Sequence, residues 1–345
     1  PDIAHDLASL AHPRSVVGLL VAAFAARRRT HGAPLTVVCC DNLTQNGALV
    51  CGLVVSFANL VDAALAGWIG REIAFPSTMV DRIVPATTAR DIEQNDDALR
   101  VHDEAPVVHE PFVQWVIEDR FAAERPAWDA AGAMFVREVD AYEAMKLRLL
   151  NASHSAFAYL GFLAGYEYIY EVAAQPDFVT WMRRFTADEV TPALVPPPGV
   201  DLVAYRDTLV RRFANPALPH RTQQIAMDGS QKLPQRILAT VRDNLAAGRN
   251  IDLASLAVAG WMRYVYGEDE QGRAIDVSDP LASTFAKLAS AHRGDPAGFA
   301  QALFAIHPIF DEDLQNEPRF TKPVVRWLEA LFAFGARNTV AKAIQ

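Results

Sequence analysis

The sequence predicts an α/β segment followed by a mostly α-helical domain, and three patterns indicate this order. A short apolar run at residues 35–40 follows a proline and has the length and composition of a buried strand in a parallel sheet. Residues 84–110 are polar and poor in strand-forming side chains. Beyond residue 137, apolar residues recur at helical spacing almost to the end. We therefore expect an α/β domain over residues 1–137 and an all-helical domain over residues 138–345.

The strand end is the first candidate for ligand binding. The predicted elements of the first domain are, in order, a helix over residues 15–29, the strand over 35–40, a helix from Asn46 to about Trp68, and a segment around Val136 that leads into the second domain. The carboxyl end of the strand presents Asp41 and Asn42, where open α/β sheets usually bind ligands. Prolines and glycines interrupt the helical pattern of the second domain at residues 196–199, 216–219 and 267–272.

Composition and charge narrow the class of protein. The 345 residues are 51% hydrophobic and 21% charged, as is typical of a soluble globular chain. A net charge of −9 argues against nucleic acid as a partner. Three cysteines make no disulfide framework and fit a reducing compartment, and the apolar run at residues 15–26 is too short to span a bilayer. We expect a cytoplasmic monomer or weak homo-oligomer that binds a small molecule and neither nucleic acid nor membrane.

Residues 145–155, Met-Lys-Leu-Arg-Leu-Leu-Asn-Ala-Ser-His-Ser, carry most of the functional information. On an α-helix, Asn151 lies about 140° round from Lys146 and His154 about 80° round, because each residue advances by about 100°. Three polar side chains then share one face with leucines and a phenylalanine. Burying such groups without partners is costly. That cost makes this face a candidate site.

Proton transfer at a carbon–oxygen bond is the chemistry that suits this trio. Burial lowers the pKa of a lysine, so a neutral Lys146 can accept a proton from an alcohol. Asn151 and His154 can donate hydrogen bonds to an oxygen that becomes negatively charged. The alternative is a lysine that reaches solvent, a surface asparagine and a core histidine bonded to a backbone carbonyl. Spacing alone favours this alternative.

The Lys-x-x-x-x-Asn-x-x-His segment resembles the signature of the mannitol dehydrogenase family, the long-chain polyol and sugar-acid dehydrogenases. Further blocks agree with that family in the expected order, at residues 40–43 with 46–47, 74–83, 110–112 with 114–116, and 228–232. The resemblance implies a partial Rossmann-type domain, then a helical domain similar to the C-terminal domain of 6-phosphogluconate dehydrogenase. It also implies a metal-independent oxidoreductase that uses NAD or NADP.

The family assigns roles to matching positions. Lys146 would be the general base in alcohol oxidation and the acid in ketone reduction. Asn151 and His154 would hold and polarise the reacting oxygen. The resemblance implies that Asn42 and Asp81 contact the substrate or the nicotinamide. It implies substrate contacts for Lys232 and Glu143 as well. Glu143 precedes Lys146 by three residues, one helical turn, which suits tuning of the base or relay of its proton.

The substrate branch depends on residues 224–236. This run is more like the fructuronate reductase branch, which interconverts D-mannonate and D-fructuronate, than the mannitol enzymes, which place basic residues just before the position of Asp228. A sugar-acid carboxylate needs a cation, and Lys232, Arg221 or Arg236 could supply it. A polyol dehydrogenase acting on D-mannitol and D-fructose is the alternative.

One feature of the family is not found in the sequence. No G-x-G-x-x-G occurs in the 345 residues, so the chain is expected to lack the Gly-rich part of the nucleotide-binding domain, and NAD cannot be told from NADP. An inactive remnant that serves as a binding or assembly module is therefore a second hypothesis. A metal-dependent lyase or hydrolase is a third, but its possible ligands lack the spacing that specifies a zinc site: His102, Asp103, Glu104 and His109.

Overall fold

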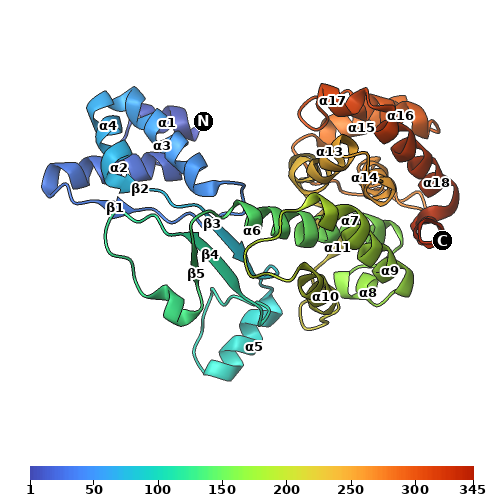
Figure 1. The fold of residues 1–345 in the computed structure, drawn as a ribbon, viewed down its shortest axis with the longest axis horizontal. Coiled ribbons are helices and arrows are strands. Elements are labelled where there is room, and N and C mark those ends of the chain that lie inside the picture. The colour runs from blue at the N-terminus through green and yellow to red at the C-terminus, as the bar shows by residue number, and fades with distance from the viewer. The chain divides into compact units, whose positions relative to one another are not determined.

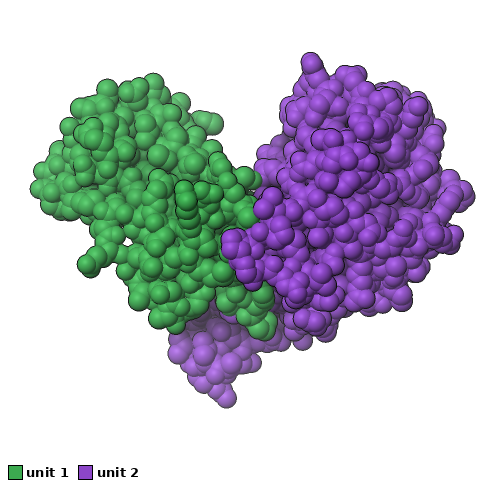
Figure 2. All heavy atoms as spheres, viewed as in Figure 1, with its two compact units in different colours: residues 1–83, 111–143 green, residues 84–110, 144–345 purple.

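The computed structural model describes residues 1–345 and divides them into two compact units (Figures 1 and 2). Unit 1 consists of Pro1–Ile83 and Pro111–Glu143. Unit 2 consists of Val84–Glu110 and Ala144–Gln345. Unit 1 carries all five strands and unit 2 is helical, so the predicted order of an α/β domain and a mostly helical domain is confirmed. The single domain boundary near residue 137 stays a prediction.

Unit 1 combines a helical layer with two small sheets. Its helices are α1 (Asp2–Ala8), α2 (Val16–Thr30), α3 (Asn46–Val61), α4 (Ala63–Glu72), the 3-10 helix η1 (Trp128–Ala131) and the start of α6 (Asp140–Met145). β1 (Leu35–Thr36) runs parallel to β2 (Ile73–Ala74). The second sheet has the order β3-β4-β5, with β3 (Thr78–Asp81) antiparallel to β4 (Gln114–Glu118) and β4 parallel to β5 (Met134–Val136).

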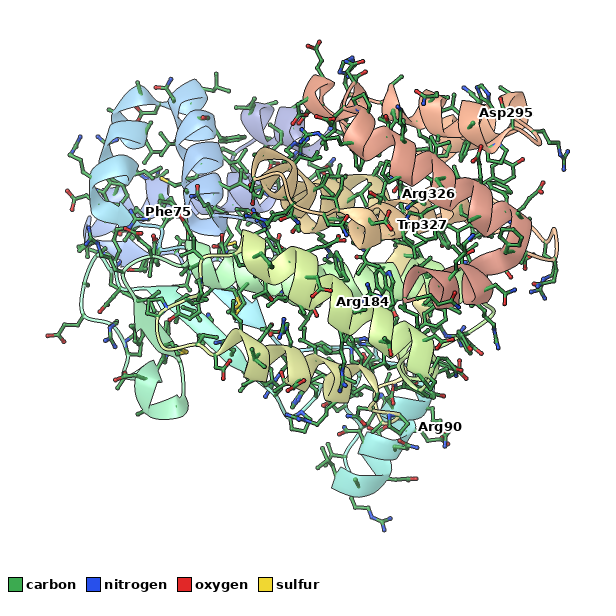
Figure 3. All side chains as sticks on the ribbon, turned by 45° about the vertical axis from the view of Figure 1, so that its right-hand side comes forward. Phe75, Arg90, Arg184, Asp295, Arg326 and Trp327 are labelled. Carbon is green, nitrogen blue, oxygen red and sulfur yellow. The ribbon has the colours of Figure 1, made fainter.

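The core of unit 1 lies between its helices and the start of β2. Phe24 of α2 meets Phe75 edge-on, with ring centroids 6.4 Å apart and planes at 89°. Phe75 is labelled in Figure 3. Val21, Val54 and Ile69 pack in the same buried cluster. Burying large apolar side chains contributes roughly 1.5–3 kcal/mol each. This cluster fixes the helices against the strand that leads to β3.

Two predictions for unit 1 were wrong in detail. The strand at residues 35–40 is parallel but has only two residues, and Leu35 is 38% exposed. β1 pairs with β2 alone. The expected helix from Asn46 to Trp68 breaks at Asp62, which is extended and accepts the backbone N–H of Ala64 as the N-cap of α4.

Unit 2 is a helical body, and no helix of the chain has the length and apolar character needed to cross a membrane. The polar stretch at residues 84–110 contains no strand, as predicted, and forms α5 (Ala89–Leu99). The remaining helices are α7 (Ala152–Leu163), α8 (Ile169–Ala173), α9 (Pro176–Arg184), α10 (Leu202–Phe213), α11 (Thr222–Ala226), α12 (Gly229–Leu233), α13 (Ala239–Ala246), α14 (Asp252–Val265), α15 (Ala282–Ala291), α16 (Pro296–Phe304), α17 (Glu312–Gln315) and α18 (Pro318–Ala343), with the 3-10 turn η4 (Thr191–Ala193). The three breaks predicted from prolines and glycines are all non-helical.

The centre of unit 2 is α14, which is almost wholly buried and packs against α7 and α18 (Figure 1). Arg326 and Trp327 of α18, labelled in Figure 3, both donate hydrogen bonds to Asp252 in the first turn of α14. Three turns of unit 2 are π-helical rather than α-helical: η2 (Lys146–Asn151), η3 (Phe185–Val190) and η5 (Pro234–Leu238).

Candidate active site

The polar signature lies on a π-helical turn. α6 passes into η2, which begins at Lys146 and ends at Asn151, and α7 follows without a break. At its end the N–H of Ala152 donates to the carbonyl of Leu147, five residues back instead of four. A π turn holds more residues than an α turn, so each residue advances by a smaller angle. Asn151, five residues after Lys146, therefore lies nearer to the direction of Lys146 than the predicted 140°.

All three signature side chains are buried. Lys146, Asn151 and His154 are 6%, 5% and 8% exposed. The asparagine is therefore not a surface residue, as the alternative interpretation required. The Nδ2 atom of Asn151 and the Nε2 atom of His154 are buried and have no hydrogen-bond partner. Buried polar groups are normally paired, so these two atoms are available to a ligand oxygen.

His154 lies in a stack of three rings. Its imidazole is 5.0 Å from the ring of Phe213 at 21°, and 5.4 Å from the ring of His220 at 25°. Burial lowers the pKa of His154 well below its ordinary value, and the charges of His220 and three nearby cations lower it further. Burial also lowers the pKa of His220 to about 4. Both imidazoles are therefore neutral at pH 7, and His220, whose Nε2 is also unpartnered, is a site residue that the sequence did not reveal.

Two of the three candidate cations lie close to His154. Lys232 and Arg236 each lower the pKa of His154 through their charge. Nζ of Lys232 donates to the carbonyl of Met227 at 2.5 Å, while Nη1 of Arg236 donates to Oγ of Ser155 at 2.9 Å. Burial lowers the pKa of both cations. Arg221 differs, because its side chain is 63% exposed and pairs with Glu167 at 3.3 Å.

The turn before Lys232 depends on a close approach of backbone to aromatic rings. Asp228 has a left-handed φ of 54° and donates its N–H to the carbonyl of Ser278. A Cβ on Gly229 would lie 2.4 Å from Nε1 of Trp261, so only glycine fits. Asp279 accepts both the N–H and the hydroxyl of Ser230. These contacts fix the start of α12 and thereby the stem of Lys232.

In unit 1, Asn46 fastens the loop after β1 to β3. Its Nδ2 donates to the carbonyls of Asp41 at 2.9 Å and Thr78 at 3.0 Å, and its Oδ1 accepts the N–H of Thr78 at 2.9 Å. Asn42 lies exposed in this loop, and Asp81, at the end of β3, is buried. The sequence indicated a turn at Asn46 but not this bridging role of its side chain.

Glu143 supports the same loop. Both carboxylate oxygens accept the backbone N–H of Gln45, at 3.2 and 3.1 Å. Gln45 has a left-handed φ of 48°, which is uncommon for a residue other than glycine. Glu143 is therefore a carboxylate that stabilises a strained residue at the N-cap of α3, a contact that the sequence did not predict.

Two of the candidate metal ligands in the loop after α5, His102 and Glu104, take part in ion-pair contacts of that loop. Nδ1 of His102 pairs with Asp96 at 2.6 Å, and Nε2 of His102 lies 3.6 Å from Glu104. Across residues 1–345, no group of three or more His, Cys, Asp or Glu side chains is arranged to hold a metal ion.

Comparisons with known proteins agree over nearly the whole chain. Residues 8–130 match the mannitol dehydrogenase Rossmann domain, and residues 138–332 match the mannitol dehydrogenase C-terminal domain. The chain is 47% identical to the uncharacterized oxidoreductase YdfI and 45% identical to D-mannonate oxidoreductase, both of Escherichia coli K12, with 99% of this chain and 70% of each relative covered.

A solved structure gives the same result. The ternary complex of Pseudomonas fluorescens mannitol 2-dehydrogenase with NAD and D-mannitol superposes with a TM-score of 0.90 at 41% identity, covering 99% of this chain and 69% of that one. The chain therefore belongs to the mannitol dehydrogenase family, and it is an oxidoreductase of the nicotinamide-dependent class that acts on CH–OH groups.

Proposed function

We propose that this chain is an NAD-dependent dehydrogenase that interconverts the secondary alcohol of D-mannonate and the ketone of D-fructuronate, with Lys146 as general acid and base. The observation that carries this proposal is the buried π turn of η2. This turn contains the buried Lys146 and Asn151, and the buried His154 follows three residues later in α7. The Nδ2 atom of Asn151 and the Nε2 atom of His154 have no hydrogen-bond partner.

The residues of unit 2 supply the proton chemistry. In oxidation, the neutral amine of Lys146 accepts the proton of the substrate hydroxyl. The N–H groups of Asn151 and of His154, in its Nε2–H tautomer, donate hydrogen bonds to the oxygen as negative charge develops on it. A donor of this kind contributes roughly 2.7–4 kcal/mol to the transition state. In reduction, the ammonium of Lys146 returns the proton.

The residues present in unit 1 fit the nicotinamide end of the cofactor. The loop after the parallel strand β1 is exposed at Asp41 and Asn42, and Asn46 holds it in place. We propose that Asn42 and Asp81 contact the nicotinamide or the substrate. When bound there, the nicotinamide would accept the hydride from the carbon that carries the hydroxyl. Asn46 keeps the loop ordered for this contact.

Two further residues complete the proposed site. Lys232 anchors the substrate, because its amine is held by the carbonyl of Met227 in a turn where Gly229 lies too close to Trp261 for a Cβ to fit. Glu143 precedes Lys146 by one helical turn, and we propose that its carboxylate tunes the base or relays its proton in addition to holding Gln45.

The choice of a sugar acid is supported by the relatives. D-mannonate oxidoreductase is 45% identical to this chain, whereas the mannitol 2-dehydrogenase of known structure is 41% identical. The cations near His154 also favour an anionic substrate over a neutral one. Reduction of D-fructose to D-mannitol is the alternative function.

The test is the rate of NADH oxidation with D-fructuronate and with D-fructose in parallel. Lys146→Ala should lower kcat by roughly 10²–10⁴-fold, the usual contribution of a general acid or base. Lys322→Ala, which removes an exposed lysine of α18, is the matched control and should behave as the natural chain does. Full activity in Lys146→Ala would refute its role as the base, and turnover of D-fructose alone would favour the alternative.

A further inference from the structure

Arg236 is a guanidinium without a carboxylate partner. It lies in η5, four residues after Lys232, and η5 contacts η2. Its one hydrogen bond runs from Nη1 to Oγ of Ser155, the residue that follows His154 on α7. Arg236 forms no ion pair with any Asp or Glu, although burial lowers its pKa and thus disfavours its charge.

Other shielded arginines of unit 2 are compensated. Arg212 forms a two-pronged pair with Glu110, and Arg148 pairs with Asp243. Arg263 donates to the backbone carbonyls of Glu268 and Asp269. Removing a cation from water without an anion is costly. A hydroxyl such as that of Ser155 offsets little of this cost, which indicates that an anion binds Arg236 in the working protein.

The geometry around Arg236 favours a carboxylate. A guanidinium presents a planar fork of N–H donors that matches the two oxygens of a carboxylate. Ser155 occupies only one of these donors and steadies the side chain against α7. Lys232 adds a second positive charge one turn earlier, and like Arg236 it donates to no carboxylate.

We propose that Arg236 binds the carboxylate of the sugar-acid substrate and so distinguishes sugar acids from neutral polyols and ketoses. This inference rests on the proposed function for its substrate class. Arg221, the other arginine suggested by the sequence, is exposed and already paired with Glu167. It is therefore the matched control, an arginine near in sequence whose loss should leave substrate choice unchanged.

The experiment compares Arg236→Gln, Arg236→Lys and Arg221→Gln with the natural chain. The measured quantities are kcat/KM for D-fructuronate and for D-fructose, and the calorimetric Kd for D-mannonate. Arg236→Gln should lower kcat/KM for D-fructuronate by about 10–150-fold, the value of a hydrogen-bonded charge. The change should appear mainly in KM and leave D-fructose unaffected, while Arg236→Lys should recover part of the loss and Arg221→Gln should lose nothing.

Different outcomes separate this inference from the proposed function. If the natural chain reduces D-fructuronate but Arg236→Gln impairs both substrates equally, Arg236 only supports α7 and the inference is overturned. If the natural chain binds D-mannonate through Arg236 without turning it over, the carboxylate site stands and the proposed reaction fails. If it neither binds nor converts the acid, both fail. Unchanged circular dichroism of the variants excludes misfolding as the cause.

Discussion

Glu110 and Arg212 form a buried ion pair. Removing the charge of one partner should lower the free energy of unfolding by several kcal/mol. The two side chains are 3% and 6% exposed. Nε of Arg212 lies 3.0 Å from Oε2 of Glu110, and its Nη2 lies 2.7 Å from Oε1. Glu110→Gln keeps the shape but removes the negative charge that faces the buried guanidinium of Arg212. We expect a loss of about 3–4 kcal/mol in the free energy of unfolding, in the lower part of the range of about 3–5 kcal/mol found when one partner of a buried pair is removed.

A double-mutant cycle makes this expectation testable. Arg212→Met alone should cost a similar amount because it leaves a buried carboxylate, whereas the double variant should cost much less than the sum of the two. The assay is urea denaturation followed by far-ultraviolet circular dichroism, with thermal midpoints as a second measure. At about 2–4 °C per kcal/mol for a unit of this size, each single variant should melt roughly 6–16 °C lower. Single-variant losses below about 1 kcal/mol, or strictly additive losses, would refute the reasoning.

Two further predictions follow from buried titratable groups. His220→Ala should lower kcat several-fold, because it removes one ring of the stack that orients His154. His220→Phe keeps a ring and should retain most of the activity. Equal losses of kcat in the two variants, measured in steady-state assays, would contradict a stacking role. Burial raises the pKa of Glu189 to about 7, above its ordinary 4.5, so the folded chain binds this proton more tightly than the unfolded chain. The free energy of unfolding should therefore fall as pH rises from about 4.5 to about 7, and chemical denaturation of Glu189→Gln should lack that part of the slope.

Local patterns predicted local features well. The polar stretch before Glu110 forms no strand, and each Pro- or Gly-rich break of the second domain interrupts the helices as expected. Gly267 and Gly272 adopt φ values of 84° and 73°, which few other residues accept. Such features depend on the chemistry of a few adjacent residues, so a single sequence contains enough information to predict them.

Contacts between distant residues were not predictable in this way. His220 stacks on His154 from a loop after α10, and nothing in the residues around His220 indicates a site. The side chain of Asn46 bridges two segments of unit 1, although its sequence context indicates only a turn. The predicted length of β1 was wrong for the same reason, because strand length depends on which neighbours pair with the strand.

The π turn of η2 is a local feature, but it depends on contacts with distant residues. Its sequence, Lys-Leu-Arg-Leu-Leu-Asn, consists mostly of good helix formers and gives no local sign of an i→i+5 turn. A π turn survives only where surrounding contacts support it, and η2 packs against both η3 and η5. On an ordinary α-helix a residue five positions after Lys146 would point well away from it. The wider turn reduces the angle between the directions of Lys146 and Asn151. In the proposed reaction, the packing of three irregular turns would thereby make a five-residue spacing suited to holding one oxygen between a base and a hydrogen-bond donor.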